Sequence, residues 1–236
     1  AVKSGELTEK RIDESVRRIL RAKTRVGLQK NRTTNIDGIS GLVGTEEHYK
    51  TAKKIAARCL TLAKDESKLV PLRPSQKVLV LTMSNKEGNS MVSRGLVSFP
   101  EELRKFSPSA KELRLSDSLR TDEMNNALSL AKEADVVVVA AYIKIVLSSG
   151  TVDLPPAHAA FLQQLVKQNP RVVLVSFGNP YIGASVPEVP VYICAYDNAK
   201  VLQEAAAEAL FGKAHFTGKL PVTISETMRF GTGLRK

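Results

Sequence analysis

Four runs of consecutive apolar, mostly β-branched residues divide the second two-thirds of the chain. They lie at 78–83, 135–142, 171–177 and 191–196. Unbroken runs of Val, Ile and Leu are typical of strands that are covered on both faces, because neither side of such a strand has to meet water. A weaker candidate of the same kind spans 112–116.

Segments with a helical spacing of apolar residues separate these runs. They lie near 89–105, 121–133, 156–168 and 199–211. Regular alternation of short strands and helices predicts an α/β fold, with a doubly wound, mostly parallel sheet sandwiched by helices. Pro221–Ile224 is predicted to add an edge strand, since proline is tolerated where a strand begins.

The N-terminal segment, 1–28, shows a different pattern. Ile12, Val16, Ile19 and Leu20 follow the spacing of one helix face, so the sequence predicts a helix over 8–28 with Thr8 as its N-cap. The next segment, 29–45, is polar and rich in glycine without any sustained period. Such a composition is typical of a linker.

A second helix is predicted over 46–62, where the spacing again becomes helical. Thr45 is a suitable N-cap, and the two glutamates that follow it lie where the helix dipole favours negative charge. The predicted organisation is therefore a separate N-terminal helix over 1–28, a linker over 29–45 and a domain over 46–236.

The net charge of +11 would suit an anionic partner, but its distribution argues against one. Residues 1–60 hold 14 Lys or Arg against 7 Asp or Glu, on the polar faces of the two predicted helices. Trp is absent and no RNA-binding or helix-turn-helix signature occurs, so nucleic-acid binding is a minor alternative to a solvated basic face. The apolar runs are far shorter than the roughly 20 residues that a membrane-spanning helix needs.

Few residues point to a cofactor. Cys59 and Cys194 are predicted to be small buried apolar residues, and His48, His158 and His215 are scattered singly as surface or structural residues. The chain contains neither a Walker motif nor a Gly-x-Gly-x-x-Gly motif, and no His/Cys cluster with metal-ligand spacing. We therefore expect neither a nucleotide cofactor nor a metal.

The loops that follow the predicted strands hold the candidate site residues, because ligands of parallel sheets bind beyond the carboxyl ends of the strands. Asp153 is the lone carboxylate between 143 and 155, and its simpler roles are to cap the next helix or to be solvated. Asn179 follows Gly178, which is expected to supply a turn, and precedes Pro180, which is expected to begin a helix. Asp197 and Asn198 are candidates for a ligand rim or for an N-cap.

Five blocks, in this order along the chain, resemble family 3 glycoside hydrolases. They are 5–28, 56–72, 173–180, 195–212 and 218–223, the last with the sequence Gly-Lys-Leu-Pro-Val-Thr. The first resembles the segment that closes the catalytic barrel of that family, and the others resemble its second, C-terminal α/β sandwich domain. The last block is the most specific of the five.

The resemblance implies an accessory domain of an exo-acting retaining β-glycosidase, with carbohydrate bound through an upstream barrel domain of the same polypeptide. Residues 1–28 would then be the last helix of that barrel. Retaining hydrolysis needs a nucleophile and a general acid/base. The family's aspartate nucleophile lies in the barrel, upstream of Ala1, so this chain alone is expected to be inactive.

Two branches of the family differ in the source of the acid/base. The β-glucosidase-like branch uses a Glu on a loop of the second domain, whereas the β-N-acetylglucosaminidase-like branch uses an Asp–His pair on a barrel loop. The comparable loop here, 143–155, contains no Glu, which favours the second branch and leaves Asp153 as a weak candidate. A stand-alone, flavodoxin-like small-molecule binding module is the other alternative. The compartment stays open between bacterial cytoplasm, periplasm and secretion.

Overall fold

A computed structural model describes residues 1–85, 97–145 and 150–236 of the chain. By its internal contacts the chain divides into two compact units, Ala1–His48 and Tyr49–Lys236. The first unit contains α1 (Glu9–Arg25), whose N-cap Thr8 accepts a hydrogen bond from the backbone N–H of Arg11, and a short 3-10 helix, η1 (Ile36–Gly41). The helix predicted over 8–28 is thus confirmed. The 3-10 helix within 29–45 was not predicted.

None of the residues of α1, all of which the structure describes, is buried. The predicted apolar stripe of Ile12, Val16, Ile19 and Leu20 is 41–55% exposed. Burial of such side chains is what stabilises most protein helices. The first unit therefore contains a helix whose apolar face has no cover within that unit.

The second unit begins within α2 (Glu46–Cys59) and contains one six-stranded sheet. The strands are β1 (Thr61–Asp65), β2 (Val78–Ser84), β3 (Lys111–Arg114), β4 (Val136–Tyr142), β5 (Val172–Ser176) and β6 (Val191–Cys194). Their spatial order is β1-β6-β5-β4-β2-β3, and all neighbours are parallel except β1 and β6. The predicted doubly wound, mostly parallel sheet is confirmed.

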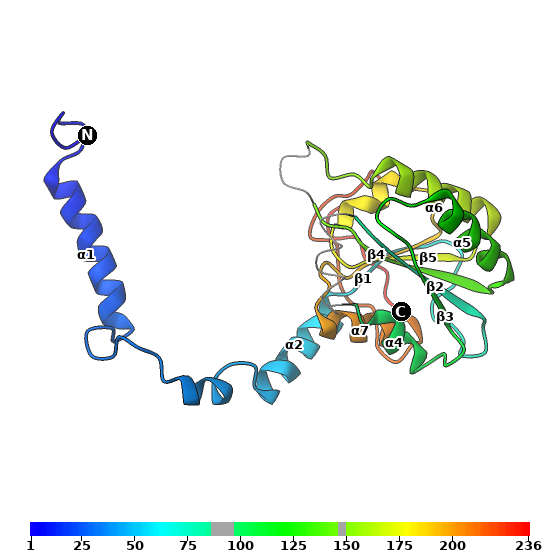
Figure 1. The fold of residues 1–236 in the computed structure, drawn as a ribbon, viewed down its shortest axis with the longest axis horizontal. Helices are drawn as coiled ribbons and strands as arrows, with labels where there is room; N and C mark the ends of the chain where they lie inside the picture. The colour runs from blue at the N-terminus through cyan, green and yellow to red at the C-terminus, as the bar shows by residue number, and fades with distance from the viewer. Residues whose placement is uncertain (86–96, 146–149) are drawn as a thin grey trace. The chain divides into compact units, whose positions relative to one another are not determined.

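Helices cover both faces of this sheet (Figure 1). One core contains side chains of α4 (Phe99–Arg104) and α7 (Lys200–Leu210), and the other contains side chains of α5 (Thr121–Glu133) and α6 (Pro156–Gln168). Alternate residues of β4 point to opposite cores, for instance Val138 to the first and Val139 to the second, and both are fully buried. Burial on both faces explains why the strand has no polar position.

Three expectations about the elements were wrong or lie outside the described residues. The predicted helix over 46–62 ends at Cys59, and the residues after it form the unpredicted edge strand β1. Pro221–Ile224 is not a strand; the backbone N–H of Ile224 instead bonds to the carbonyl of Met228 in a local turn. About half of the helix predicted over 89–105, residues 89–96, lies outside the described residues, and the described remainder contains α4.

The C-terminal segment returns to β1. The backbone N–H of Leu234 donates to the carbonyl of Leu62, the two residues form an antiparallel bridge, and the Lys236 ammonium pairs with the buried carboxylate of Asp65. The first strand of the second unit and its C-terminal segment therefore lie side by side. None of the described helices is long and apolar enough to cross a bilayer.

Candidate functional site

The sheet reverses its direction of winding between β2 and β4. From β2 the chain moves outward to the edge strand β3 and then returns to β4 on the other side of β2. The loops that leave the carboxyl ends of β2 and β4 therefore diverge. In doubly wound sheets such a point opens a crevice, and it is where ligands bind.

A side-chain amide bridges the two diverging loops. Asn85, directly after β2, donates from Nδ2 to the carbonyl oxygen of Lys144 over 2.8 Å, and its Oδ1 accepts from the Lys144 N–H at 3.4 Å. His158, in the first turns of α6, fixes the same strand end, since its Nε2 lies 3.0 Å from the carbonyl oxygen of Ser84.

His158 is 3% exposed, which confirms its predicted structural role. Burial lowers the pKa of its imidazole, because the charged form loses its hydration, and the bond to Ser84 offsets only part of that effect. Its Nδ1 has no hydrogen-bond partner among the described residues.

Asn179 ties the loop after β5 to the loop after β4. It is 3% exposed, and its Nδ2 donates to the carbonyl oxygen of Val152 over 2.6 Å. Its Oδ1 accepts from the N–H of Tyr181, so Asn179 caps the 3-10 helix η2 (Pro180–Ser185). Both polar atoms of this amide are thus used within the protein. Pro180 begins a helix as predicted.

Gly178 is required for a close approach of two loops rather than for an unusual turn. Its φ is not positive, but a Cβ at this position would lie 2.6 Å from the carbonyl oxygen of Ile143, closer than van der Waals contact allows. The backbone N–H of Asn179 donates to that same oxygen over 3.0 Å. Any side chain at 178 would therefore separate β5's loop from β4's.

These loops line a cavity of about 330 Å³ at the carboxyl edge of the sheet. Its polar lining comprises Asn85, Lys144, Thr151, Asp153 and Asn179, of which the sequence had singled out only the last two as site candidates. One cation and one carboxylate thus share the rim. A cavity of this volume is in the range that accommodates one small ligand or one sugar ring.

Asp153 lies on this rim but, contrary to one expectation, does not cap α6. The N-cap of α6 is Pro155, and no side-chain cap bond to it occurs among the described residues. The carboxylate is exposed and accepts a hydrogen bond from the Thr151 hydroxyl over 2.7 Å, while that hydroxyl oxygen accepts from the Asp153 N–H. The alternative expectation, a solvated carboxylate, fits this geometry.

Asp197 and Asn198 lie elsewhere, in the loop after β6, and are not in the described lining of the cavity. Asp197 Oδ1 accepts from the N–H of Ala199, which is itself the N-cap of α7, so Asp197 makes a turn just ahead of the cap. Tyr196 before them has a left-handed backbone, φ +67°, and its hydroxyl donates to Thr61 Oγ1. Burial raises its pKa to about 12.

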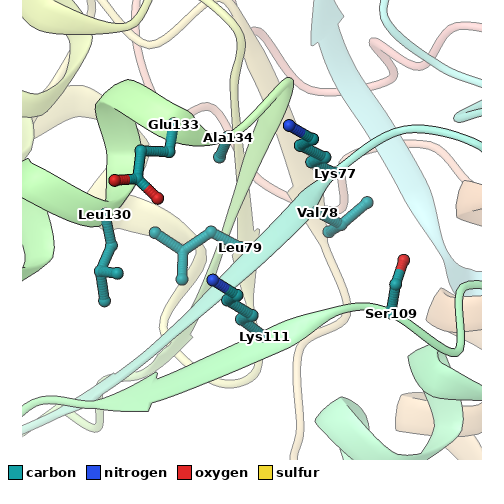
Figure 2. Close-up of a pocket in the computed structure, with 8 residues that line it drawn as sticks. All are labelled: Lys77, Val78, Leu79, Ser109, Lys111, Leu130, Glu133 and Ala134. Carbon is teal, nitrogen blue, oxygen red and sulfur yellow. The ribbon is translucent and has the colours of Figure 1, made fainter.

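A second pocket, of about 250 Å³, lies at the opposite, amino edge of the sheet. Figure 2 shows Leu79 and Leu130 among the Lys77, Lys111 and Glu133 side chains that line it. Because these polar groups come from the beginnings of β2 and β3 and the end of α5, the pocket lies away from the diverging loops. The cavity at the carboxyl edge is therefore the candidate site. Among the described residues, no group of three or more His, Cys, Asp or Glu could hold a metal ion.

Residues 60–231 match the Glycosyl hydrolase family 3 C-terminal domain. The chain is 28% identical to a β-N-acetylglucosaminidase/β-glucosidase of Cellulomonas fimi over 94% of its own length and 40% of that protein. It is 25% identical to the thermostable β-glucosidase B of Acetivibrio thermocellus over 94% of its length and 31% of that protein. The chain thus spans at most about two-fifths of these two relatives.

Solved structures agree in fold. A family 3 β-N-acetylglucosaminidase from Paenibacillus superposes with a TM-score of 0.75 at 24% identity, covering 95% of this chain and 41% of that one. A β-glucoside phosphorylase superposes with a TM-score of 0.71 at 28% identity, covering 97% and 41%. Because the family match extends over nearly three-quarters of its residues, this chain belongs to the C-terminal domain family of the family 3 glycoside hydrolases.

Proposed function

We propose that this chain is the second domain of an exo-acting, retaining β-glycosidase of the β-N-acetylglucosaminidase-like branch. The observation that carries the proposal is the family match over 60–231. A barrel domain in the same polypeptide would supply the nucleophile, since the relatives extend well beyond the matched part. In this organisation 1–28 is the last helix of that barrel, 29–45 a linker and 46–236 the sandwich domain.

The exposed apolar face of α1 supports this assignment of the first unit, because a barrel would supply the cover that the unit lacks. The cavity at the carboxyl edge supports a role for the second unit at the rim of a sugar site. Lys144, Thr151 and Asp153 offer a cation, a hydroxyl and a carboxylate there, which are groups that hydrogen-bond sugar hydroxyls.

Asp153 is proposed to bind a sugar hydroxyl at this rim and not to serve as the general acid. An acid must hold a proton near neutral pH, which requires burial or a neighbouring negative charge. Asp153 is exposed, and its carboxylate accepts a hydrogen bond from the hydroxyl of Thr151. The alternative, a β-glucosidase-like enzyme whose acid/base comes from loop 143–155, would have to use Asp153, the one carboxylate of that loop.

The test compares the full-length protein with this chain alone on nitrophenyl β-N-acetylglucosaminide and nitrophenyl β-glucoside. The full-length protein should release nitrophenol, and this chain should not, because covalent catalysis needs the nucleophile of the barrel. The proposal would be contradicted if the isolated chain released nitrophenol and a point substitution within the chain abolished that activity. A full-length protein inactive on every β-glycoside would favour the alternative of a stand-alone binding module.

A second candidate function is phosphorolysis. Loop 143–155 has a single carboxylate and a lysine on the cavity, and two structures of a β-glucoside phosphorylase resemble this chain at 28% and 29% identity. Phosphate is already anionic, so it needs no general base, and nearby carboxylates would repel it. Its oxygen would bond to the anomeric carbon of the glycosyl–enzyme as the bond to the enzyme carboxylate breaks. If the enzyme is a phosphorylase, product analysis in phosphate buffer should show that glycosyl phosphate forms faster than the free sugar that hydrolysis releases.

A further inference from the structure

One fully buried amide, that of Gln203 on α7, binds groups from three separate segments. Its Oε1 accepts from the backbone N–H groups of Ser98 and Phe99, over 2.8 and 2.9 Å, and from the hydroxyl of Tyr142 over 2.7 Å. Its Nε2 donates to the carbonyl oxygen of Asn198 over 2.7 Å. Three donors on one carbonyl oxygen exceed its two lone pairs, so this group is crowded with partners.

The partners of Gln203 stand where the carboxyl-edge loops begin or end. Tyr142 is the last residue of β4, directly before the loop that leads to the cavity rim. Asn198 belongs to the loop after β6, and Phe99 is the first residue of α4. The amide therefore connects three segments that are remote from one another in the sequence.

Aromatic packing extends the same connection to the loop after β5. The ring of Phe177 stacks on that of Tyr142, with centroids 5.0 Å apart and planes at 16°, and it lies 5.0 Å from the ring of Phe99. Phe177 is followed by Gly178 and Asn179, and Asn179 donates to the carbonyl oxygens of Ile143 and Val152 in the loop after β4. Such ring pairs have preferred geometries and resist sliding.

We propose that Gln203 is a positioning residue for the carboxyl-edge loops. It is absent from the described lining of the cavity and acts on the rim through Tyr142 and Phe177. Removing its amide frees the Tyr142 hydroxyl and lets the end of β4 shift, which moves the rim that binds the sugar. The proposal rests on the function proposed above, since it concerns the same site.

A second buried amide in the chain provides a matched control. Asn169 is 4% exposed, its Nδ2 donates to the carbonyl oxygens of Ala131 and Ala134, and its Oδ1 accepts from the N–H of Arg171. These partners lie at the amino edge of the sheet, where α5 ends and β5 begins. Both amides join distant segments, but of the two only Gln203 has partners at the carboxyl edge of the sheet, at the end of β4 and after β6.

The experiment uses the full-length enzyme with Gln203→Met and Asn169→Leu, which each replace an amide by an apolar side chain of similar size. Both variants should lower the melting temperature. Gln203→Met should raise KM roughly tenfold with kcat nearly unchanged, which is the kinetic sign of lost substrate binding, and Asn169→Leu should change neither, because its partners lie at the opposite edge of the sheet. The proposal would be overturned if the two variants lost the same melting temperature and also had the same KM.

Tyr142→Phe keeps the test decisive if Gln203→Met does not fold. It removes one of the four hydrogen bonds, and should raise KM by less than Gln203→Met does but by at least about twofold, the ratio that corresponds to the weak end of a neutral hydrogen bond's net contribution. Hydrogen exchange at amides 150–154 should also accelerate in Tyr142→Phe and not in Asn169→Leu. Unchanged exchange at these amides in Tyr142→Phe would contradict the coupling, whether or not the protein has glycosidase activity. If the wild type is inactive on glycosides but exchange is accelerated in Tyr142→Phe, only the proposed function is refuted.

Discussion

The side-chain amide of Asn179 donates to the backbone carbonyl of Val152 over 2.6 Å, so a residue just beyond β5 holds the loop that follows β4. The two residues belong to different strand–helix connections, and Asn179 is nearly excluded from solvent. The shape of the cavity rim therefore depends on an amide whose polar atoms are both engaged within the protein.

Asn179→Ala should lower the free energy of unfolding by about 1–3 kcal/mol, because it removes the bond to Val152 and the cap of η2 and leaves their buried partners unsatisfied. Urea denaturation of the chain measures this loss. Asn126→Ala, at an exposed position of α5, is the control and should stay within about 0.5 kcal/mol of the wild type. Equal effects of the two changes would contradict the role given to Asn179.

Asp153→Asn in the full-length enzyme should leave kcat within a few-fold of wild type, since the amide oxygen of Asn still accepts from Thr151. Loss of a general acid would instead cost about 10²–10⁴-fold. The decisive measurement adds azide to the variant with an activated substrate. A collapse of activity that azide rescues as glycosyl azide would make Asp153 the acid/base and assign the enzyme to the β-glucosidase-like branch.

Gly178→Ala should destabilise the second unit by about 1–3 kcal/mol, the usual effect of forcing an extra methyl group into a packed site. Its Cβ would meet the Ile143 carbonyl oxygen at 2.6 Å, and that oxygen belongs to backbone that cannot turn away cheaply. Gly41→Ala is a suitable control, because no described atom lies within 4 Å of its added Cβ. Thermal unfolding of both variants tests the difference.

His158 should make the domain sensitive to acid. Burial lowers the pKa of its imidazole below the ordinary 6.5, so the unfolded chain binds a proton that the folded chain resists. Stability should therefore fall as the pH drops below 6.5. His158→Gln keeps a donor for the Ser84 carbonyl but cannot be protonated, and it should lose less stability between pH 7 and pH 5.

His215→Gln, at an exposed position of the same unit, serves as the control for His158. It should follow the acid dependence of the wild type, because the substitution removes an exposed histidine and leaves the buried His158 in place. Urea midpoints at several pH values measure all three proteins. Parallel curves for wild type and His158→Gln would show that the buried imidazole does not contribute.

The sequence predicted the elements that are buried on both sides of the sheet, and it missed those at the edges. The β-branched runs 135–142 and 171–177 indicated β4 and β5 correctly, because a strand between two cores carries an unbroken apolar signal. The start of β1 falls within the predicted helix over 46–62, and the strand is short and includes Lys64 and Asp65. An edge strand of that length has no periodicity that separates it from a helix end.

The candidate site was predicted only as a set of loops. Asp153 and Asn179 both follow strands, β4 and β5, that the structure shows to be adjacent, and both line the cavity. The sequence could not indicate that both polar atoms of the Asn179 amide form hydrogen bonds, to Val152 and Tyr181, or that Asp197 makes a turn with Ala199. Such bonds depend on how the loops pack. Gln203 carried no signal, because a glutamine in a helix is ordinarily solvated.

The antiparallel pairing of β1 with β6, and the bridge from Leu62 to Leu234, set the order in which this domain can assemble. The strand that follows α2, β1, pairs with β6, which is the last strand to be synthesised. Its other contact is with Leu234, close to the C-terminus of the chain. During synthesis, β1 must therefore wait as an unpaired segment until nearly the whole domain has been made. Its shortness and its Lys64 and Asp65 protect it during that interval, since charged, short strands resist pairing with other chains.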